Sequence, residues 1–429
     1  MRASSILACG APVLAAVAAV ACAASGNESD TTLSPDSGSR ETPIPDGGER
    51  PVVDADIEAS AKGPLCSADG WCATSLPDVD LTMRNIWPLA GHAFAVAVSP
   101  TLGAKVLEWN DSEGSWKYID DGTQNEPGMG DYVGIVWAPN VNEVYYGVAP
   151  GYIYHGTRPE SPQAAWSWTR HRLGDGGDSI VWATGTTVPA LGVWGTSASD
   201  VYAWFTNTIY HWKSVDGGTP TWVSEYVADD ADDPSERLLI LGAAGTSADD
   251  IWFSGVRSYS YQGCAIALRK TAAEYRRITD GVLATPYGPC TARAGAALLG
   301  GAEGALTSIQ ASAKDAIVGL KGERDVVRIS VDGDSYSFAV SPVPPALGDA
   351  WTSLWKGPDA LWLSGIGGNV SGRVIRGSDA PDGGGYEISR ISLFGGPFNE
   401  TEFLYQVRGT ENTNLWAIGS RYALHKTTP

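Results

Sequence analysis

Histidine, a residue that often ligates metals and transfers protons near neutral pH, occurs five times in this chain of 429 residues. Three of these histidines hold equivalent places in a repeated sequence pattern, namely His155, His211 and His425. The other two are His92 and His171. Three histidines can together ligate a zinc ion. Equivalent positions of successive repeats lie apart from one another, however. We therefore predict that these three are structural, with a ring nitrogen satisfying the backbone of a neighbouring repeat.

Two acidic segments offer clustered oxygen ligands of the kind that calcium prefers, namely "GDGGDS" at 174–179 and "ADDADD" at 228–233. Neither has the spacing of an EF-hand loop, and solvated acidic loops are the favoured interpretation. We therefore expect no cofactor and no metal, with calcium at these loops as the alternative. The motifs of P-loop nucleotide sites, of dinucleotide-binding folds and of the α/β-hydrolase nucleophile elbow do not occur.

Two other segments resemble the Asp-box turn of sialidases, S-x-D-x-G-x-x-W. "SVDGGTPTW" at 214–222 and "SVDGDSYSF" at 330–338 are each one residue longer than this motif, and the second also has Phe338 in place of tryptophan and Asp334 in place of glycine. Such turns lie away from the catalytic centre, so they indicate strands and not hydrolysis. A glycosidase needs paired carboxylates, or a tyrosine with an acid, near its reacting centre, and no spacing singles out such a pair.

Four of the six cysteines lie outside the N-terminal apolar segment, namely Cys66, Cys72, Cys264 and Cys290. An even number of cysteines in an exported chain favours disulfides. Zinc is the alternative, but neither pair has C-x-x-C spacing or a nearby cluster of histidines. We predict the disulfides Cys66–Cys72 and Cys264–Cys290.

The first residues, "MRASSILACGAPVLAAVAAVACAASG", combine one positive charge with an apolar run of small residues, which is the layout of a secretory signal peptide. Ala19-Val20-Ala21-Cys22 resembles a bacterial lipobox, in which the cysteine is lipidated and becomes the mature N-terminus. We predict a signal peptide at 1–21 and lipidation of Cys22. Ordinary signal-peptidase cleavage, with Cys22 uninvolved, is the alternative.

Residues 22–62 form the next predicted part, the lipidated cysteine followed by an acidic tether. Residues 23–62 contain nine acidic and three basic residues and no aromatic ones, so they cannot bury enough apolar surface to fold. The residue after Cys22 is alanine and not aspartate, which in many Gram-negative bacteria lets a lipoprotein reach the outer membrane. We expect an exported protein at the outer membrane or cell surface, held there by lipid alone.

The charge and the composition of the chain exclude several classes of protein. A formal net charge of −20 argues against nucleic acid as a partner, because phosphate binding requires a basic face. No segment after the signal region approaches the roughly eighteen apolar residues of a membrane-spanning helix. The 52 glycines, 26 prolines, 17 tryptophans and 17 tyrosines favour short strands joined by tight turns, and thus an all-β fold.

A repeated phrase determines the architecture. "VWGTSASDVYAWF", "AAGTSADDIWFSG" and "VRGTENTNLWAIG" each place a Trp-Gly-like pair, a polar turn and an acid or amide before an alternating strand. Looser copies bring the number to seven, spaced 44 to 65 residues apart. The anchor residues of the seven copies, each directly before an aromatic or apolar strand, are His92, Glu143, Asp200, Asp250, Asp315, Asp359 and Asn414.

Each unit has the pattern of four short strands, and seven units of this length predict a seven-bladed β-propeller of antiparallel blades over residues 63–429. The last unit ends at Pro429 without a fourth strand, whereas residues 70–77, "GWCATSLP", precede the first unit unused. We predict that this segment supplies the outer strand of the seventh blade, which removes an open sheet edge.

The phrases "CSADGWC" followed by "LP", and "VWG-x-S-x-x-D-V-x-A-x" followed by "I-x-H-W", resemble myxobacterial exported lipoproteins built from tryptophan-rich propeller repeats. The resemblance covers residues 66–429 and is most specific at 66–77, 191–212, 243–255 and 407–426. It implies the propeller fold and export, and no particular chemistry.

We expect a non-catalytic, surface-exposed module for recognition or scaffolding, a monomer whose partner is a cell-envelope protein or glycan. Its binding residues are unknown; the longest loops follow Asp175, Asp229 and Gly281, and Trp166 and Trp168 could stack on sugars. Most tryptophans are expected between blades. The alternative function is a divergent sialidase-like glycan hydrolase.

Overall fold

The computed structural model describes residues 65–161, 164–174, 188–231, 235–259, 262–283, 288–366, 372–379, 385–392 and 403–428. The predicted signal peptide, the lipidated Cys22 and the tether lie outside the described residues. None of the described residues forms a helix with the length and hydropathy that a membrane span requires.

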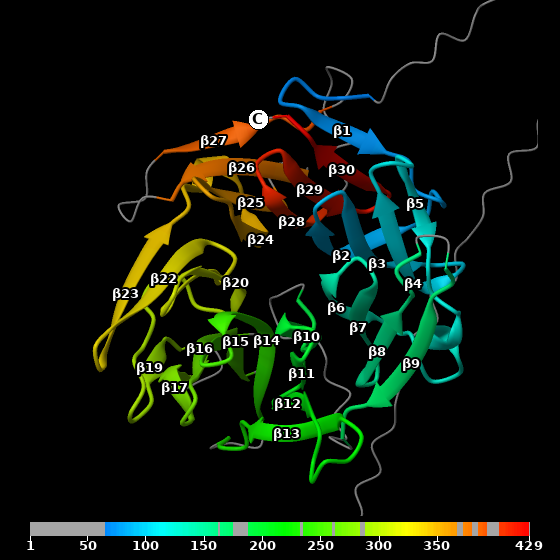
Figure 1. The fold of residues 1–429 in the computed structure, drawn as a ribbon. Helices are drawn as coiled ribbons and strands as arrows, with labels where there is room; N and C mark the ends of the chain where they lie inside the picture. Colours follow the sequence, from blue (N-terminus) through cyan, green and yellow to red (C-terminus); the bar gives the residue numbers. More distant parts are fainter. Residues whose placement is uncertain are drawn as a thin grey trace, which may run out of the picture. The chain divides into compact units, whose positions relative to one another are not determined.

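Seven four-stranded antiparallel sheets lie around a central axis, which confirms the predicted seven-bladed β-propeller (Figure 1). The innermost strands of blades 1 to 7 are β2 (Thr82–Leu89), β6 (Val133–Asn140), β10 (Leu191–Ser197), β14 (Glu236–Ser247), β20 (Leu306–Ala313), β24 (Ala350–Lys356) and β28 (Leu404–Glu411). The second strands are β3 (His92–Ser99), β7 (Glu143–Val148), β11 (Asp200–Phe205), β15 (Asp250–Tyr259), β21 (Ala316–Lys321), β25 (Ala360–Ile366) and β29 (Asn414–Gly419).

The outer half of each blade follows in the same order. The third strands are β4 (Gly103–Asn110), β8 (Tyr152–Thr157), β12 (Thr208–Lys213), β16 (Gln262–Lys270), β22 (Asp325–Asp332), β26 (Gly372–Ser378) and β30 (Tyr422–Lys426). The fourth strands are β5 (Ser115–Tyr118), β9 (Ser167–Arg172), β13 (Thr221–Val227), β17 (Tyr275–Thr279), β23 (Ser335–Pro342), β27 (Tyr386–Ser389) and, in blade 7, β1 (Trp71–Thr74). Two short 3-10 turns, η1 (Thr123–Asn125) and η2 (Pro345–Leu347), lie in connections.

The ring closes as the sequence predicts. β1 pairs antiparallel with β30, with Trp71 opposite Lys426 and Thr74 opposite Ala423. The N-terminal strand therefore completes a blade whose other three strands come from the C-terminus. The Cys66–Cys72 disulfide, predicted from the sequence and present in the structure, ties the turn that precedes this strand.

The Trp-Gly pairs of the repeat act between neighbouring blades. A Cβ atom built on Gly195 of blade 3 would lie 2.8 Å from the indole of Trp137 in blade 2, and one on Gly245 of blade 4 would lie 3.1 Å from Trp194 in blade 3. In blades 2 and 3 the tryptophan of the innermost strand thus packs where the next blade has no side chain. Close packing of this kind explains why glycine follows the tryptophan in the repeat.

Blade 4 departs from the common pattern and accounts for the longest spacing between anchors. Its strands β14 and β15 are 12 and 10 residues long, and a hairpin of β18 (Gly281–Leu283) and β19 (Cys290–Ala292) follows them. The second predicted disulfide, Cys264–Cys290, joins β16 to this hairpin and is present.

Candidate functional site

The three equivalent histidines belong to the framework of their own blades. In blades 2, 3 and 7 each histidine stacks on an aromatic ring of the second strand, with ring centres 3.9 to 4.2 Å apart, and its Nε2 pairs with the anchor residue at 2.9 to 3.1 Å. The three groups are Glu143–Tyr145–His155, Asp200–Tyr202–His211 and Asn414–Trp416–His425. The structural role is as expected, but the predicted partner was wrong. The histidine bonds the anchor of its own blade, because the two lie on adjacent strands.

The anchor residues, in turn, connect blades. Asp250 accepts a hydrogen bond from the backbone N–H of Asp315 at 2.8 Å, and Asn414 donates to the carbonyl of Leu89 at 3.0 Å. In blade 4 an arginine, Arg269, replaces the histidine and donates to Asp250 at 3.3 Å. Asp250 and Asn414 therefore link their own blade to the next one around the ring.

Trp166 and Trp168 are not the exposed rings that the sequence suggested. Both pack against the blade 1–blade 2 core; Trp166 meets Phe94 edge to face at 5.6 Å, and the indole of Trp168 donates to the carbonyl of Ile119 at 2.8 Å. The role as an exposed sugar-stacking surface is therefore wrong for this pair. The two Asp-box-like segments connect third to fourth strands in blades 3 and 5, which agrees with their interpretation as turns.

Of the two acidic segments, residues 175–179 and 232–233 lie outside the described residues. In the part that the structure describes, Asp230 pairs with Arg277 at 2.5 Å and with Arg293 at 3.3 Å. Burial alone would raise the pKa of Asp230, but these arginines outweigh it and lower the pKa to about 2. The carboxylate of Asp230 already has cationic partners within the protein.

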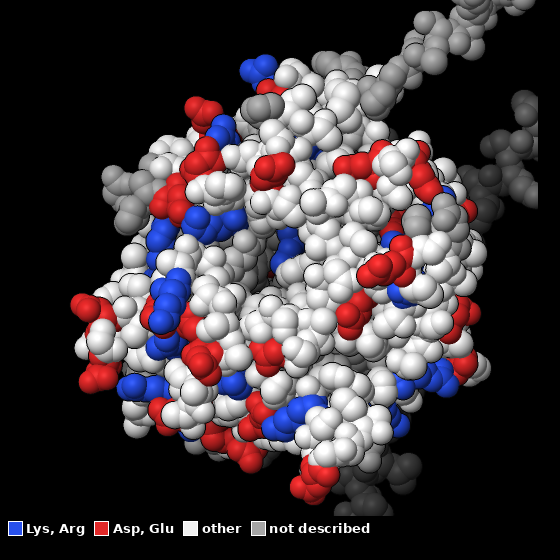
Figure 2. Space-filling model, viewed as in Figure 1, with Lys and Arg blue, Asp and Glu red and all other residues white. Residues whose placement is uncertain are grey.

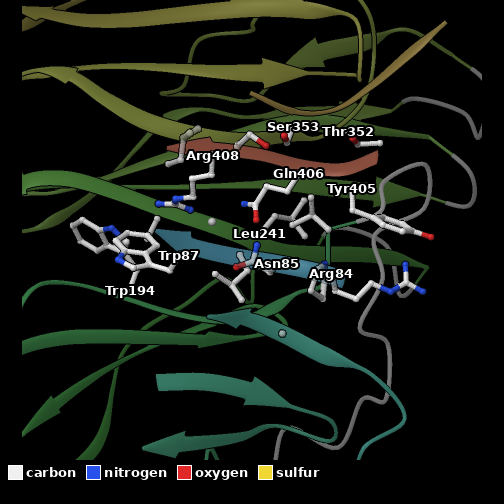
Figure 3. A pocket seen from close by; sticks show the side chains of 18 of the residues that line it. Arg84, Asn85, Trp87, Trp194, Leu241, Thr352, Ser353, Tyr405, Gln406 and Arg408 are labelled. Atoms are coloured by element: carbon white, nitrogen blue, oxygen red, sulfur yellow. The ribbon is translucent and has the colours of Figure 1, made fainter. Parts of the chain in front are cut away.

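A pocket lies on the axis of the ring, where the seven innermost strands meet (Figure 3). Its cavity volume is about 90 Å³, which is room for a few water molecules or one side chain, not for a folded ligand. We call it the axial pocket. The polar and aromatic residues used below to define it are Arg84, Asn85, Trp87, Trp194, Trp204, Thr352, Ser353, Tyr405, Gln406 and Arg408.

β-bulges turn these side chains toward the axis. The pairing register shifts near the beginning of β2, β6, β20, β24 and β28 and in the middle of β14, for instance between Met83 and Asn85 and between Leu404 and Gln406. A bulge leaves one residue out of the ladder and re-aims its neighbours. The residues at these shifts, such as Arg84 and Tyr405, line the pocket.

Two amide side chains cross the middle of the axial pocket in fixed orientations. The Oε1 atom of Gln406 accepts the backbone N–H of Ile86 at 2.7 Å, and the Oδ1 atom of Asn85 accepts that of Val136 at 3.1 Å. Because each amide oxygen is engaged between adjacent blades, the NH₂ end is left to face the pocket. Figure 3 shows both side chains between the two ends of the pocket.

An arginine stacked on an aromatic ring lies at each end of the axial pocket. The guanidinium of Arg408 lies 3.8 Å from the ring centre of Trp87, and that of Arg84 lies 4.4 Å from the ring centre of Tyr405 (Figure 3). Burial lowers the pKa of Arg408 to about 9, so the side chain is protonated at neutral pH. Figure 2 shows a basic side chain inside the hollow at the ring centre, with acidic side chains on the surrounding face.

The side chains that line the axial pocket are of few chemical types, namely arginines, amides, hydroxyls, aromatic rings and aliphatic groups. No aspartate, glutamate or histidine is among the described residues that line it. The hydroxyl of Thr352 donates to the carbonyl of Leu404 at 2.7 Å, and that of Ser353 accepts the N–H of Val407 at 2.7 Å, so both hydroxyls belong to the framework.

The axial pocket was not predicted from the sequence, although one signal was present. Arg408 stands in "VRGT" at the place where Trp194 stands in "VWGT", so blade 7 has a charge where blade 3 has an apolar ring. Asn85 and Gln406 gave no such signal, because only the fold shows that their strands face the axis.

Comparisons with known proteins support the fold alone. No protein-family model and no curated protein matches the sequence. The chain is similar to the structure "YCF48 bound to D1 peptide", with a TM-score of 0.52, 14% identity and coverage of 85% of this chain and 99% of that one. It is also similar to YCF48 from Cyanidioschyzon merolae (TM-score 0.52, 14% identity, 83% and 98% covered). A chain of the Mitotic Checkpoint Complex matches with a TM-score of 0.52 and 11% identity, with 85% and 96% covered. The chain therefore has the β-propeller fold.

Proposed function

We propose that this protein is a non-catalytic recognition module of the bacterial cell envelope, which binds a protein partner at the axial pocket. The observation that carries the proposal is the polar lining of that pocket. Its amides and hydroxyls are locked by bonds between blades, and its two arginines stack on aromatic rings. A rigid set of hydrogen-bond donors without a nucleophile or an acid pair suits binding and not bond cleavage.

A protein partner is favoured over a glycan. The aromatic side chains expected to stack on sugars, Trp166 and Trp168, pack between blades instead. The similar YCF48 structure has a peptide bound, so a propeller of this general shape can serve peptide recognition. A sialidase-like hydrolase would need carboxylates at the axis, and the described lining of the axial pocket contains none.

The location at the envelope rests on the N-terminal sequence. A signal peptide at 1–21, lipidation of Cys22 and the acidic segment that follows would hold the propeller near the outer membrane or cell surface by lipid alone. Cys22→Ala should release the protein from the membrane fraction, whereas Cys9→Ala, in the same apolar segment, should leave it there. Unchanged fractionation of the Cys22 variant would contradict lipidation.

The partner can be sought by chemical cross-linking of the full chain in intact cells, followed by mass spectrometry. We expect one envelope protein whose cross-links map to residues around the axial pocket and which added purified propeller protein competes away. Cross-links scattered over the outer strands, or specific retention of glycans instead of protein, would argue against the proposal. Turnover of fluorogenic sialosides by the purified chain would show that it is an enzyme.

A further inference from the structure

We propose that the axial pocket is a carboxylate-binding site, which takes the acidic side chain or the C-terminal carboxylate of an extended segment of the partner protein. This inference rests on the proposed recognition function and names the chemistry of its ligand. Three features of the pocket carry it, namely the free edge of Arg408, the orientation of two amides and the balance of charge.

The first feature is the guanidinium of Arg408. Its flat face lies on the indole of Trp87 at 3.8 Å, while no hydrogen-bond acceptor or carboxylate partner for it occurs among the described residues. Stacking uses the face of a guanidinium and leaves its in-plane N–H groups free. Those N–H groups match the two oxygens of a carboxylate, which can accept two parallel hydrogen bonds.

The second feature is the pair of amides beside that guanidinium. The oxygens of Asn85 and Gln406 are engaged by backbone N–H groups of neighbouring blades at 3.1 and 2.7 Å, so their NH₂ groups are the ends presented to a ligand. The indole Nε1 of Trp204, a further lining residue that is 1% exposed, is a donor with no acceptor among the described residues. The guanidinium edge of Arg408 and the two NH₂ groups are therefore donors, which select an acceptor.

The third feature is the charge. The chain has 49 acidic and 29 basic residues, yet the axial pocket contains two arginines and no described carboxylate. A mostly buried cation without a counter-charge is costly for the folded state. A carboxylate ligand would supply the negative charge that the Arg408 guanidinium lacks in the axial pocket.

The dimensions of the axial pocket favour a carboxylate on a narrow chain. About 90 Å³ accommodates the end of one side chain or of a peptide, but excludes a sugar ring together with its substituents. A carboxylate has two oxygens with about four acceptor positions, which the guanidinium edge and the two amides can fill. A phosphate dianion carries more charge than the single guanidinium of Arg408 neutralises. Arg84 on Tyr405 lies at the other end of the pocket and would attract an acidic segment to it.

The test uses the purified full chain and two matched pairs of biotinylated heptapeptide pools built from glycine, alanine and serine. In one pair the central residue is Glu or Gln and the C-terminus is amidated; in the other, an acid-free peptide ends in a free carboxylate or an amide. By biolayer interferometry we expect the acid of one pair to bind at least tenfold more tightly than its amide counterpart. The pair that shows this difference identifies the source of the carboxylate.

Arg408→Met should abolish that difference, because methionine keeps contact with Trp87 but has no charge. The matched control is Arg276→Met, which removes an exposed arginine stacked on Tyr336 at 5.4 Å outside the axial pocket and should leave binding within twofold. The unfolding midpoint of each variant shows whether it is folded. Acetate should displace the acidic peptide from the unmodified chain, whereas acetamide should not, so the test does not depend on a variant.

The possible outcomes separate this inference from the proposed function. Equal binding of acid and amide peptides, binding retained in Arg408→Met, or tighter competition by inorganic phosphate than by acetate would each overturn the carboxylate site. If Arg408→Met still forms the cross-link to the envelope partner, the recognition function stands without it. If the unmodified chain forms no such cross-link in cells but shows the acid preference in vitro, the carboxylate site stands and the proposed protein partner fails.

Discussion

The indole Nε1 of Trp71 donates a hydrogen bond to the Oγ of Ser389 at 2.9 Å, across 318 positions of the sequence. Trp71 lies on β1 in blade 7, whereas Ser389 ends β27 in blade 6. The indole also meets that of Trp362 in blade 6 edge to face at 6.1 Å. The N-terminal strand therefore completes one blade and fastens it to the preceding one.

Trp71→Ala should destabilise the whole ring. The side chain is 0% exposed, and removal of a fully buried tryptophan costs about 3–5 kcal/mol of unfolding free energy. Urea denaturation followed by circular dichroism measures this change. Val79→Ala is the matched control, because Val79 lies just after the closing strand and is 87% exposed. Equal midpoints for the two variants would show that β1 contributes little to closure.

The two disulfides should differ in their contribution to stability. Cys264 and Cys290 are 26 positions apart, whereas Cys66 and Cys72 are 6 apart. Loop-closure entropy predicts about 3.5 kcal/mol for the longer loop and about 2 kcal/mol for the shorter one. C264A/C290A should therefore lower the free energy of unfolding more than C66A/C72A does, measured by urea denaturation under the same conditions. The reverse order would contradict an entropic origin.

Much of the fold could be predicted from the sequence because the same local constraints recur in every blade. Each anchor residue lies at the first position of a second strand or directly before it, as Asp200 and Asp315 illustrate. Trp-Gly pairs mark innermost strands because, between blades 2, 3 and 4, each indole packs against a glycine of the next blade. Ring closure followed from counting strands, since an incomplete last blade requires a strand from elsewhere in the chain.

The site was less accessible to sequence reasoning because it depends on contacts between blades. Asn85 is an ordinary polar residue until a bulge turns it to the axis and the N–H of Val136 engages its oxygen. His211 could be assigned a structural role by its position, but its partner Asp200 lies on an adjacent strand of the same blade. The sequence carries the repeat but not the register that brings such side chains together.

A buried ion network in blade 4 should be sensitive to loss of its arginine. Arg257 is 1% exposed and donates to Asp280 at 2.8 and 3.0 Å and to Glu236 at 3.0 Å. Arg257→Met leaves buried carboxylates short of a counter-charge, which costs about 3–5 kcal/mol. Urea denaturation should show this loss, whereas Lys117→Met, which breaks the exposed pair with Glu113, should change stability by less than about 0.5 kcal/mol. Similar losses of stability in the two variants would show that the buried ion network contributes no more than the exposed pair.

His425 should make the protein less stable in mild acid. Burial lowers the pKa of His425 to about 4, and its partner Asn414 carries no charge to offset this effect. An unfolded histidine titrates near pH 6.5, so the unfolded chain binds the proton first. Stability should therefore fall as the pH drops from about 6.5 toward 4, by up to about 3 kcal/mol from this residue. Urea midpoints measured between pH 4 and 7.5 report this loss.

Asn414→Asp isolates the contribution of His425 from that of other acid-sensitive groups, including His171, whose pKa burial also lowers. Blade 3 already has an aspartate, Asp200, at the position that corresponds to Asn414. Burial opposes protonation of His211, but its bonds to Asp200 and Glu225 outweigh burial and raise its pKa. An aspartate at 414 should act on His425 in the same direction, so the variant should lose less stability between pH 6.5 and 4 than the unmodified chain. NMR titration should show the His425 pKa moving upward. Parallel stability curves for the two proteins, with an unmoved His425 resonance, would show that the neutral partner does not set this pH dependence.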